Sequence, residues 1–303
     1  MKSNLKIKLY ELFDEWLNYK RTKVKESTYF NYSFVVNECL KKYFKNVDLD
    51  DIENSSFYRI IEELKENISR KTLRDRISIL KSILRYAERK YDMDLKIDLI
   101  DMPVIYNKEI EVLTEREKNR ITNYLLNTNN IREVGILISL YTGLRIGEVC
   151  ALKWKNIDFN KKILDVEKTV QRIYMGEKKT KVVFSEPKTI KSIRKVPIAE
   201  TLLKKLREIK CDYSENSFIL TGTEERFMEP ITYRFTYKKC LKNCNVFYKK
   251  FHCLRHTFAT RCIRAGMDAK SLSEVLGHNN VDVTLSIYVH SSYKIKKKYI
   301  DKI

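Results

Sequence analysis

Residues 252–260 read His-Cys-Leu-Arg-His-Thr-Phe-Ala-Thr, and this stretch gives the clearest indication of the fold that we expect. His252 and Arg255 are three positions apart at the start of a predicted helix, so both side chains lie on one side of its first turn. All four histidines of the chain fall within its last 52 residues. An imidazole and a guanidinium on one helical turn can bind an anion and move a proton. The C-terminal part of the chain is therefore where we expect a reactive site.

A second arginine lies upstream, in residues 142–148, which read Thr-Gly-Leu-Arg-Ile-Gly-Glu. The two glycines flank Arg145 at a predicted helix junction, where they let the backbone bend and let a bulky ligand approach. Glu148, three residues on, is placed to brace the Arg145 guanidinium. Further along, Lys188 lies at a predicted turn of a β-rich segment, from which its tip can reach a neighbouring cleft.

Two more reactive side chains follow the stretch at 252–260. His278 comes just after a glycine that ends a predicted helix, and Tyr288 follows it by ten residues. Together the set suits attack on a phosphodiester, because arginine forks stabilise charge that grows on the phosphate oxygens. A tyrosine hydroxyl can form a covalent phospho-enzyme, and a lysine or histidine can protonate the leaving oxygen. With arginines neutralising the phosphate, we expect no metal ion and no cofactor.

The order of these residues and the strings around them resemble the tyrosine recombinase (phage integrase) family. Three strings carry the resemblance: Thr-Gly-Leu-Arg-x-Gly-Glu at 142–148, His-x-Leu-Arg-His-Thr-Phe-Ala-Thr at 252–260, and Leu-Gly-His-x5-Thr-x3-Tyr at 276–288. Residues 287–290 and the basic tail after them are most similar to integrases of Gram-positive conjugative transposons and phages. The resemblance covers the whole chain and implies an enzyme that cleaves and rejoins DNA through a 3′-phosphotyrosine intermediate, integrating or excising a mobile element.

The resemblance also implies what each residue does. Arg145 and Arg255 would clamp the scissile phosphate, and Lys188 would be the general acid to the departing 5′-oxygen. His252 would assist proton transfer from the nucleophile, and His278 would hydrogen-bond the phosphate. Two rounds of strand exchange within a tetramer would then pass through a Holliday junction.

Tyr288 is the nucleophile that this resemblance implies, and its attack would leave a free 5′-hydroxyl. Tyr293 and Tyr299 are nearby alternatives, but the spacing from His278 favours Tyr288. We expect His256 to be a supporting residue packed behind the arginine pair, and we assign no role to His290.

Two further alternatives concern the lysine and a metal. Lys191 and Lys195 share the predicted hairpin of Lys188 and are alternatives to it. The pattern Cys240-x3-Cys244-x7-His252-x3-His256 superficially resembles a zinc site. Its gap of seven is shorter than the roughly twelve residues of a zinc finger, so we favour the reading without metal.

Composition agrees with a nucleic-acid partner. The formal net charge is +20 and the isoelectric point is near 9.5. Residues 1–106 hold 21 Lys and Arg against 18 Asp and Glu, whereas residues 107–303 hold 39 against 22, so the excess lies in the C-terminal two thirds. An excess of this size indicates a polyanionic partner. Seven scattered cysteines and the lack of an apolar leader or a long apolar run indicate a reduced, cytoplasmic protein without a membrane partner.

Hydrophobic periodicity predicts a mainly α fold with a small antiparallel sheet, an α+β class. We expect a helical core-DNA-binding domain at 1–101, a linker at 102–109 and a mixed α/β catalytic domain at 110–303, arranged as a C-shaped DNA clamp. The sheet would come from short β-prone pieces within 163–198. A helix at about 69–91 carries basic residues along one edge, and two cations near the sheet are further candidates for phosphate contacts. The candidate DNA contacts are Arg70, Lys71, Arg74, Lys81, Arg85, Arg89, Arg172 and Lys181.

The resemblance implies double-stranded recombination sites as the substrate, a homo-tetramer on DNA formed from free monomers, and an accessory DNA-bending or excision factor. The tail at 291–303, with apolar Ile295, Tyr299 and Ile300 at helical spacing, either docks on a neighbouring protomer or packs on its own domain. Rival functions are resolution of chromosome or plasmid dimers, a type IB topoisomerase, and a non-catalytic DNA-binding regulator. Many integrases of this kind carry an additional N-terminal arm-binding domain, so we expect either a simple recombinase or a truncated chain.

Overall fold

The structure is a computed structural model of the whole chain. It describes residues 7–45, 47–49, 61–65, 68–105, 110–176, 179–185, 193–210, 213–278, 280–288 and 300–301. At 176, 283 and 286–288 it describes the backbone and not the side chain. The chain forms two compact units, of which the first comprises Met1–Lys108 with Ile173–Lys181 and the second Glu109–Arg172 with Val182–Ile303.

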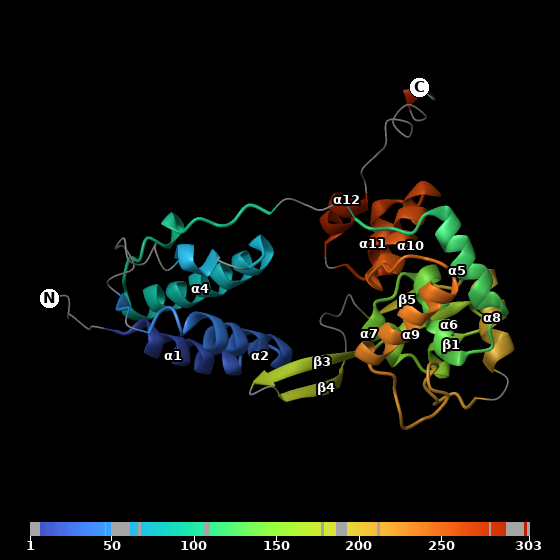
Figure 1. Cartoon of the computed structure of the whole chain (residues 1–303), viewed down its shortest axis with the longest axis horizontal. Coiled ribbons are helices and arrows are strands. Elements are labelled where there is room, and N and C mark those ends of the chain that lie inside the picture. Colours follow the sequence, from blue (N-terminus) through green and yellow to red (C-terminus); the bar gives the residue numbers. More distant parts are fainter. Residues whose placement is uncertain are drawn as a thin grey trace. The chain divides into compact units, whose positions relative to one another are not determined.

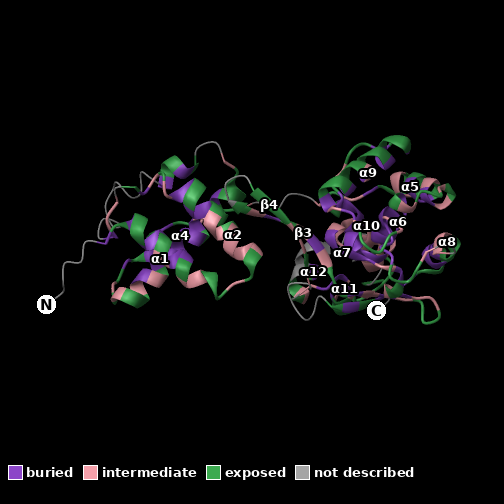
Figure 2. Ribbon diagram, turned by 90° about the horizontal axis from the view of Figure 1, so that it is seen from below, coloured by how far each residue is buried: buried purple, intermediate pink, exposed green. Residues whose placement is uncertain are grey.

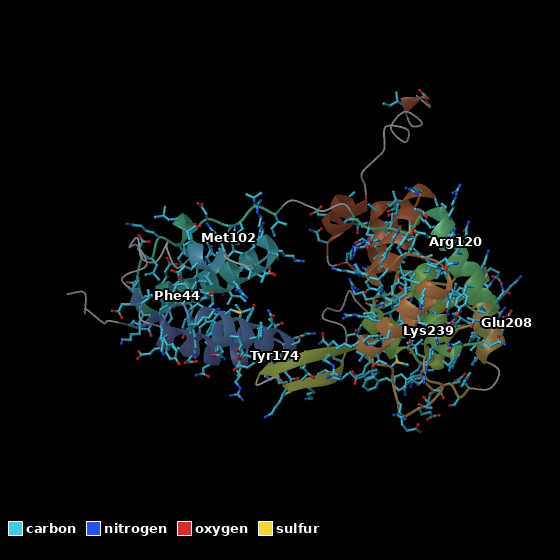
Figure 3. All side chains as sticks on the ribbon, viewed as in Figure 1. Phe44, Met102, Arg120, Tyr174, Glu208 and Lys239 are labelled. Atoms are coloured by element: carbon cyan, nitrogen blue, oxygen red, sulfur yellow. The ribbon has the colours of Figure 1, made fainter. Side chains whose placement is uncertain are left out.

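The first unit is built from helices that bury one apolar face each. Its described elements are α1 (Leu9–Arg21), α2 (Glu26–Phe34), the π-helix η1 (Val35–Leu40) that continues α2, α4 (Arg70–Tyr91) and the 3-10 turn η3 (Ile97–Leu99) (Figure 1). Trp16 of α1 is fully buried, and Phe44 (labelled in Figure 3) packs edge-on against Phe13, with ring centroids 6.0 Å apart. The Ser69 hydroxyl caps α4 by accepting a hydrogen bond from the backbone N–H of Thr72.

The second unit carries the remaining helices around a small sheet. Its helices are α5 (Glu115–Asn127), α6 (Ile131–Thr142), α7 (Ile146–Ala151), the 3-10 turn η4 (Trp154–Asn156), α8 (Glu200–Lys210), α9 (Pro230–Asn243), α10 (His252–Arg264), α11 (Ala269–Leu276) and α12 (Val281–Tyr288). A capping box begins α5, since Thr114 and Glu117 exchange hydrogen bonds. Buried residues, purple in Figure 2, gather between the helices of each unit.

The β-prone segment forms two small sheets instead of the single one expected. One contains β1 (Ile157–Asp158), β2 (Ile163–Val166) and β5 (Arg194–Pro197) in antiparallel order β1-β2-β5, with Leu164 opposite Val196. The other pairs β3 (Thr169–Gly176) with β4 (Lys179–Ser185). The prediction of a mainly helical fold with a small antiparallel sheet component is confirmed.

The β3–β4 hairpin has a tip that belongs to the first unit. Tyr174 of β3 (labelled in Figure 3) packs edge-on against Phe34 of α2, with ring centroids 5.2 Å apart, and the Lys181 ammonium lies 3.8 Å from the Glu26 carboxylate. These contacts group residues 173–181 with the helical unit, whereas the sequence had placed them in the catalytic domain. Apolar periodicity cannot predict this, because the partner of Tyr174 is far away in the chain.

Candidate active site

Arg255 lies at the centre of the candidate site. It is the fourth residue of α10, and its side chain is only 1% exposed. One terminal nitrogen donates a hydrogen bond to the carbonyl of Gly143 at 2.9 Å, and the other donates to the carbonyl of Leu276 at 2.8 Å. Gly143 ends α6 at φ +70°, a left-handed conformation in which a Cβ would meet the ring of Phe258. The guanidinium is therefore fixed in place by the end of α6 and the end of α11.

Arg145 stands at the N-terminus of α7, where it is the capping residue. Its backbone N–H donates to one carboxylate oxygen of Glu148 at 2.9 Å, and its guanidinium donates to the other, also at 2.9 Å. The Arg145 side chain is 39% exposed, whereas the Glu148 carboxylate is buried. The sequence-based expectation that Glu148 braces Arg145 describes this arrangement. Arg145 is consequently the cation of the cluster that a ligand in solution can reach.

Arg194, the first residue of β5, completes the cluster, and sequence reasoning had missed it. Its two terminal nitrogens donate to the two Glu148 carboxylate oxygens at 3.1 and 3.0 Å, and its Nε donates to the carbonyl of Val275 at 2.6 Å. Burial alternates along β5, so that Arg194 shares the inward face with Val196. That alternation was the signal available in the sequence, because a charged residue on the inward face of a strand needs a buried partner.

Three guanidinium groups therefore bond three consecutive carbonyls at the C-terminal end of α11. Arg194 bonds Val275, Arg255 bonds Leu276, and Arg145 makes a longer contact of 3.4 Å with Gly277. The last carbonyls of a helix lack intrahelical partners and carry partial negative charge, which favours cations at this end. The end of α11 thus collects the cations that the chain brings from α7, β5 and α10.

His278 follows this helix end and is half-buried, and its Nδ1 is 2.8 Å from the hydroxyl of Thr284 in α12. Its pKa is lowered to about 4, first because burial disfavours the charged imidazole and then because Arg255 and Arg145 repel a further positive charge. His278 is therefore neutral at pH 7. A neutral ring can donate or accept one hydrogen bond at its other nitrogen.

His252 and His256 stand one turn apart on α10, with ring centroids 4.5 Å apart and ring planes nearly perpendicular. The His252 residue reaches the surface, yet its pKa is lowered to about 4. The largest cause is the protein that displaces water around the ring, followed by electrostatic repulsion from His256 and Arg255. Burial, followed by the charge of Arg255, lowers the pKa of His256. A neutral His252 is able to accept a proton.

Tyr288 is the last residue of α12, and its side chain lies outside the described part of the structure. The backbone of α12 packs against α10 and α11, and Thr284, four residues before Tyr288, bonds His278. Lys188 and its alternative Lys191 fall within residues 186–192, which also lie outside the described residues. This segment joins β4 to β5, so it is not the turn of the β3–β4 hairpin. His290, Tyr293 and nearly all of the tail at 291–303 are likewise outside the description.

The helix α4 presents five of its six predicted DNA contacts at the surface: Arg70, Lys71, Arg74, Arg85 and Arg89 are exposed. Lys81 departs from the expectation, because its side chain is only 9% exposed. On the helical wheel Lys81 is next to buried Ile77, about 40° away at 100° per residue, so its aliphatic stem packs at the edge of the apolar face. The exposed part of the basic stripe therefore consists of five cations.

The two candidate contacts on the hairpin are both paired with carboxylates. Arg172 of β3 forms an ion pair with Glu229, and Lys181 of β4 lies near Glu26. Lys195, the other alternative to Lys188, is exposed on β5 opposite Asp165. A phosphate contact by Arg172 or Lys181 would have to compete with these carboxylates.

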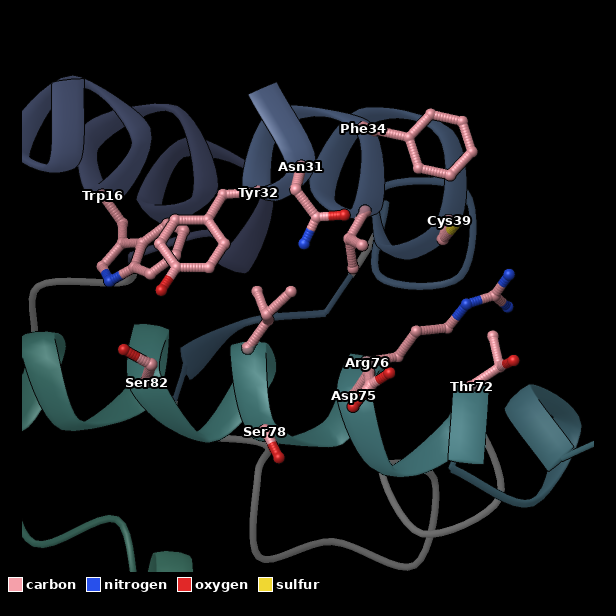
Figure 4. A pocket seen from close by; sticks show the side chains of 12 residues that line it. Trp16, Asn31, Tyr32, Phe34, Cys39, Thr72, Asp75, Arg76, Ser78 and Ser82 are labelled. Atoms are coloured by element: carbon pink, nitrogen blue, oxygen red, sulfur yellow. The ribbon is translucent and has the colours of Figure 1, made fainter. Parts of the chain in front are cut away.

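A groove of about 530 Å³ lies in the first unit between α2, η1 and α4 (Figure 4). Its rim mixes Asp75 and Arg76 with serines, and Trp16 and Tyr32 lie at one end of it. The groove has no excess of either charge and is not part of the arginine cluster.

Among the described residues, no three His, Cys, Asp or Glu side chains are placed to hold a metal ion, so the zinc alternative has no site there. No helix in the described part of the chain is long and apolar enough to cross a membrane.

Comparison with known proteins shows the family to which the chain belongs. The sequence profile of the phage integrase family matches residues 109–294, and that of the phage integrase N-terminal SAM-like domain matches residues 8–65. The chain belongs to the phage integrase family, a family of tyrosine recombinases. The resemblance inferred from the three sequence strings is thereby confirmed.

Several curated proteins are similar to the chain in sequence. A XerC-like tyrosine recombinase of Caldanaerobacter subterraneus is 32% identical over 213 residues, which cover 64% of this chain and 54% of that protein. The integrase of Staphylococcus phage L54a is 25% identical over 97% of this chain and 92% of its own length. The ICEBs1 integrase of Bacillus subtilis is 25% identical over 92% and 78%. The chain thus spans about half the length of the XerC-like relative and most of the phage integrase.

Solved structures share the fold. The Tn1549 transposon integrase, determined in complex with a circular intermediate DNA, superposes with a TM-score of 0.76 at 23% identity, over 98% of this chain and 100% of that one. A lambda integrase tetramer bound to a Holliday junction gives a TM-score of 0.69 at 16% identity, over 97% and 82%. At these identities the likeness establishes the architecture of the two domains.

Proposed function

We propose that this chain cleaves and rejoins double-stranded DNA with Tyr288 as nucleophile, and that it integrates or excises a mobile element. The observation that carries the proposal is the gathering of Arg145, Arg255 and two neutral histidines at the end of α11. Such a cluster suits a phosphate that gains negative charge in its transition state. The phage and conjugative-element integrases among the relatives support the mobile-element assignment.

In this mechanism the two clamping arginines have different tasks. Arg255 is held by two carbonyls before any substrate arrives, so it offers a preorganised cation and loses little freedom on binding. Arg145 has one face on Glu148 and is partly exposed, so it can turn from its long contact with Gly277 to a phosphate oxygen. His278 would donate its remaining N–H to the same phosphate.

Proton transfer would involve His252 and Lys188. His252 is neutral at pH 7 and stands at the start of α10, so it can accept the proton of the attacking phenol. Lys188 would protonate the 5′-oxygen, which leaves poorly as an alkoxide. The product of this step is a 3′-phosphotyrosine and a free 5′-hydroxyl, and the reverse reaction with a new 5′-hydroxyl would rejoin the strand.

DNA binding would combine this site with basic surface elsewhere. The stripe of Arg70, Lys71, Arg74, Arg85 and Arg89 would contact phosphates, with Arg172 and Lys181 as further candidates.

We propose a homo-tetramer on DNA that assembles from monomers, with an accessory DNA-bending or excision factor, in the cytoplasm. Light scattering of complexes formed with and without residues 291–303 tests whether the tail joins protomers, and an unchanged tetramer would exclude that role.

The test of the function is a nicked suicide duplex taken from the attachment region beside the gene. Cleavage near the nick releases a short oligonucleotide, so the covalent complex accumulates and can be mapped by mass spectrometry. We expect a DNA adduct on Tyr288 and none in Tyr288→Phe. A two-site assay then separates the functions: exchange between the ends of an element supports integration or excision, and reaction only at a chromosomal dimer-resolution site supports the Xer-type alternative.

A further inference from the structure

Arg194 has a position that family resemblance did not assign. It comes from β5, a strand of the small sheet, and its side chain is 5% exposed. Its guanidinium forms a parallel fork with both oxygens of Glu148, at 3.1 and 3.0 Å, while Nε bonds the carbonyl of Val275. A fork of this kind fixes both the distance and the orientation of the two partners. Arg194 therefore ties α7 to the end of α11 through the sheet.

The charges in this contact do not cancel evenly. Glu148 carries one negative charge and receives hydrogen bonds from two guanidinium groups, those of Arg145 and Arg194. If Arg194 were absent, the buried carboxylate would face Arg145 as its only directly bonded cation, and the pair would be close to neutral. With Arg194 present, one positive charge remains in excess, and it is at Arg145 that the cluster reaches solvent. Buried charges interact strongly because the surroundings screen them poorly.

The same residue limits the shape of the helix end. Gly277 adopts φ +65°, and a Cβ there would lie 3.1 Å from the Arg194 side chain. Arg194 thus packs directly against the residue whose carbonyl contacts Arg145 and which precedes His278. Movement of Arg194 would shift the end of α11, and with it two groups of the phosphate site.

We propose that Arg194 is a positioning residue of the phosphate site: it takes up the charge of Glu148 and holds the end of α11, so that Arg145 presents a net positive charge to the scissile phosphate. The inference rests on the proposed function for its chemistry, since the phosphate is the one that Tyr288 would attack. It assigns Arg194 no contact with DNA.

The experiment compares wild type, Arg194→Met, Arg194→Lys, and the double variant Glu148→Gln/Arg194→Met. Single-turnover formation of the covalent adduct on the suicide duplex gives the rate, and a filter-binding titration of the same duplex gives the affinity. We expect Arg194→Met to cleave about 100-fold more slowly, with affinity within about threefold of wild type, because displaced groups cost rate more than binding. Removing the carboxylate charge in the double variant restores the excess at Arg145, so its rate should recover at least about tenfold.

The pH dependence separates a charge role from a merely structural one. Burial raises the pKa of Glu148, but the charge and hydrogen bonds of Arg194, and then of Arg145, bring it below its ordinary value. Of the two arginines that lower the Glu148 pKa, Arg194 has the larger effect, so this pKa should rise in Arg194→Met. Cleavage by this variant should then increase as pH falls from 8 to 6, because protonation frees Arg145. His252 and His278 face the same site with wild-type pKa values of about 4. Arg194 lowers the pKa of His278 less than burial, Arg255 and Arg145 do, so both histidines stay neutral in this window without it.

A second measurement does not depend on cleavage. Sulfate binding, followed by the imidazole NMR signals of His278, reports on the cluster in the absence of DNA. We expect Arg194→Met to weaken sulfate binding about tenfold and the double variant to restore it. If sulfate binding follows this order among the three proteins but the wild type forms no adduct with DNA, the proposed function is refuted. The role of Arg194 in the anion site is then still supported.

Three results would overturn the inference. One is an Arg194→Met protein that cleaves as fast as wild type, and another is a double variant no faster than the single one in both assays. The third applies where Arg194→Met does not fold, as judged by thermal melting. Arg194→Lys, which keeps the charge, should then retain cleavage within about tenfold of wild type, and a 100-fold loss in folded Arg194→Lys would contradict the role in charge balance.

Discussion

The protein carries two clusters of cations that differ in how they are held. The stripe on α4 consists of exposed arginines and a lysine along one edge of a helix. The cluster at the end of α11 consists of arginines from three separate elements, and two of them are buried and bonded to carbonyls or a carboxylate. Interactions of exposed cations are screened by salt, whereas the buried cations are fixed in place when the chain folds. The first arrangement suits affinity for a polyanion, and the second suits chemistry on one phosphate.

This difference predicts that a buried arginine controls the rate and leaves binding nearly unchanged. Arg255→Lys keeps the charge but loses the two-carbonyl fork, and we expect adduct formation to slow by about 10³-fold with little change in DNA affinity. Single-turnover cleavage and filter binding on the suicide duplex provide the two numbers. Arg261→Lys, on the same helix but partly exposed, is the matched control and should stay near wild type. A loss of binding as large as the loss of rate would erase the distinction between the clusters.

The end of α11 should tolerate no side chain at Gly277. Gly277→Ala adds the strain of a left-handed alanine and brings a Cβ to 3.1 Å from Arg194, so we expect the free energy of unfolding to fall by about 2 kcal/mol. Urea unfolding of Gly277→Ala in an Arg194→Ala background, compared with Arg194→Ala alone, measures the backbone part, because the long side chain that the Cβ would meet is then absent. An equal loss in the two backgrounds would show that Arg194 does not restrict this turn.

The stripe on α4 should act on affinity and on its salt dependence. Replacing Arg74 and Arg85 together by glutamine should weaken DNA binding about tenfold at low salt. It should also reduce the slope of log affinity against log salt by about 0.9 for each phosphate that the variant no longer neutralises. The rate of cleavage by bound protein should not change. Lys45→Gln, an exposed lysine outside the stripe, serves as the control. An unchanged salt slope would exclude the stripe from the DNA interface.

A further expected effect is a pH dependence of stability from His278. Its pKa of about 4 in the folded protein is below the ordinary value of 6.5, so between these values the unfolded chain binds more protons than the folded one. The contribution to stability is therefore complete above pH 6.5 and declines as pH falls toward 4. Urea unfolding of His278→Gln at pH 7 and pH 5 should show a weaker decline than wild type. A decline of the same size in both would place the pKa of His278 near its ordinary value.

The sequence predicted those features that depend on local pattern. Helix α4 begins at the Ser69 cap and ends at Tyr91 as its periodicity indicates, and the strings around Arg145 and Arg255 identified two of the arginines that the structure brings together. Long-range pairing was not predictable in the same way. The residues near Arg194 in the chain do not identify Glu148 as its partner. The alternation along β5 indicates that Arg194 faces inward, but not which residue it meets. The packing of Lys81 and the contact of Tyr174 with Phe34 likewise depend on tertiary neighbours.

The nucleophile is tested most directly by mapping the covalent adduct on the suicide duplex. We predict one DNA-linked peptide, containing Tyr288, and no adduct in Tyr288→Phe, while Tyr293→Phe and Tyr299→Phe react as wild type does. The Tyr288→Phe protein should bind the duplex with wild-type affinity, since the phenol is not expected to hold DNA. An adduct that persists in Tyr288→Phe, or that maps to another tyrosine, would contradict the assignment of Tyr288 as nucleophile.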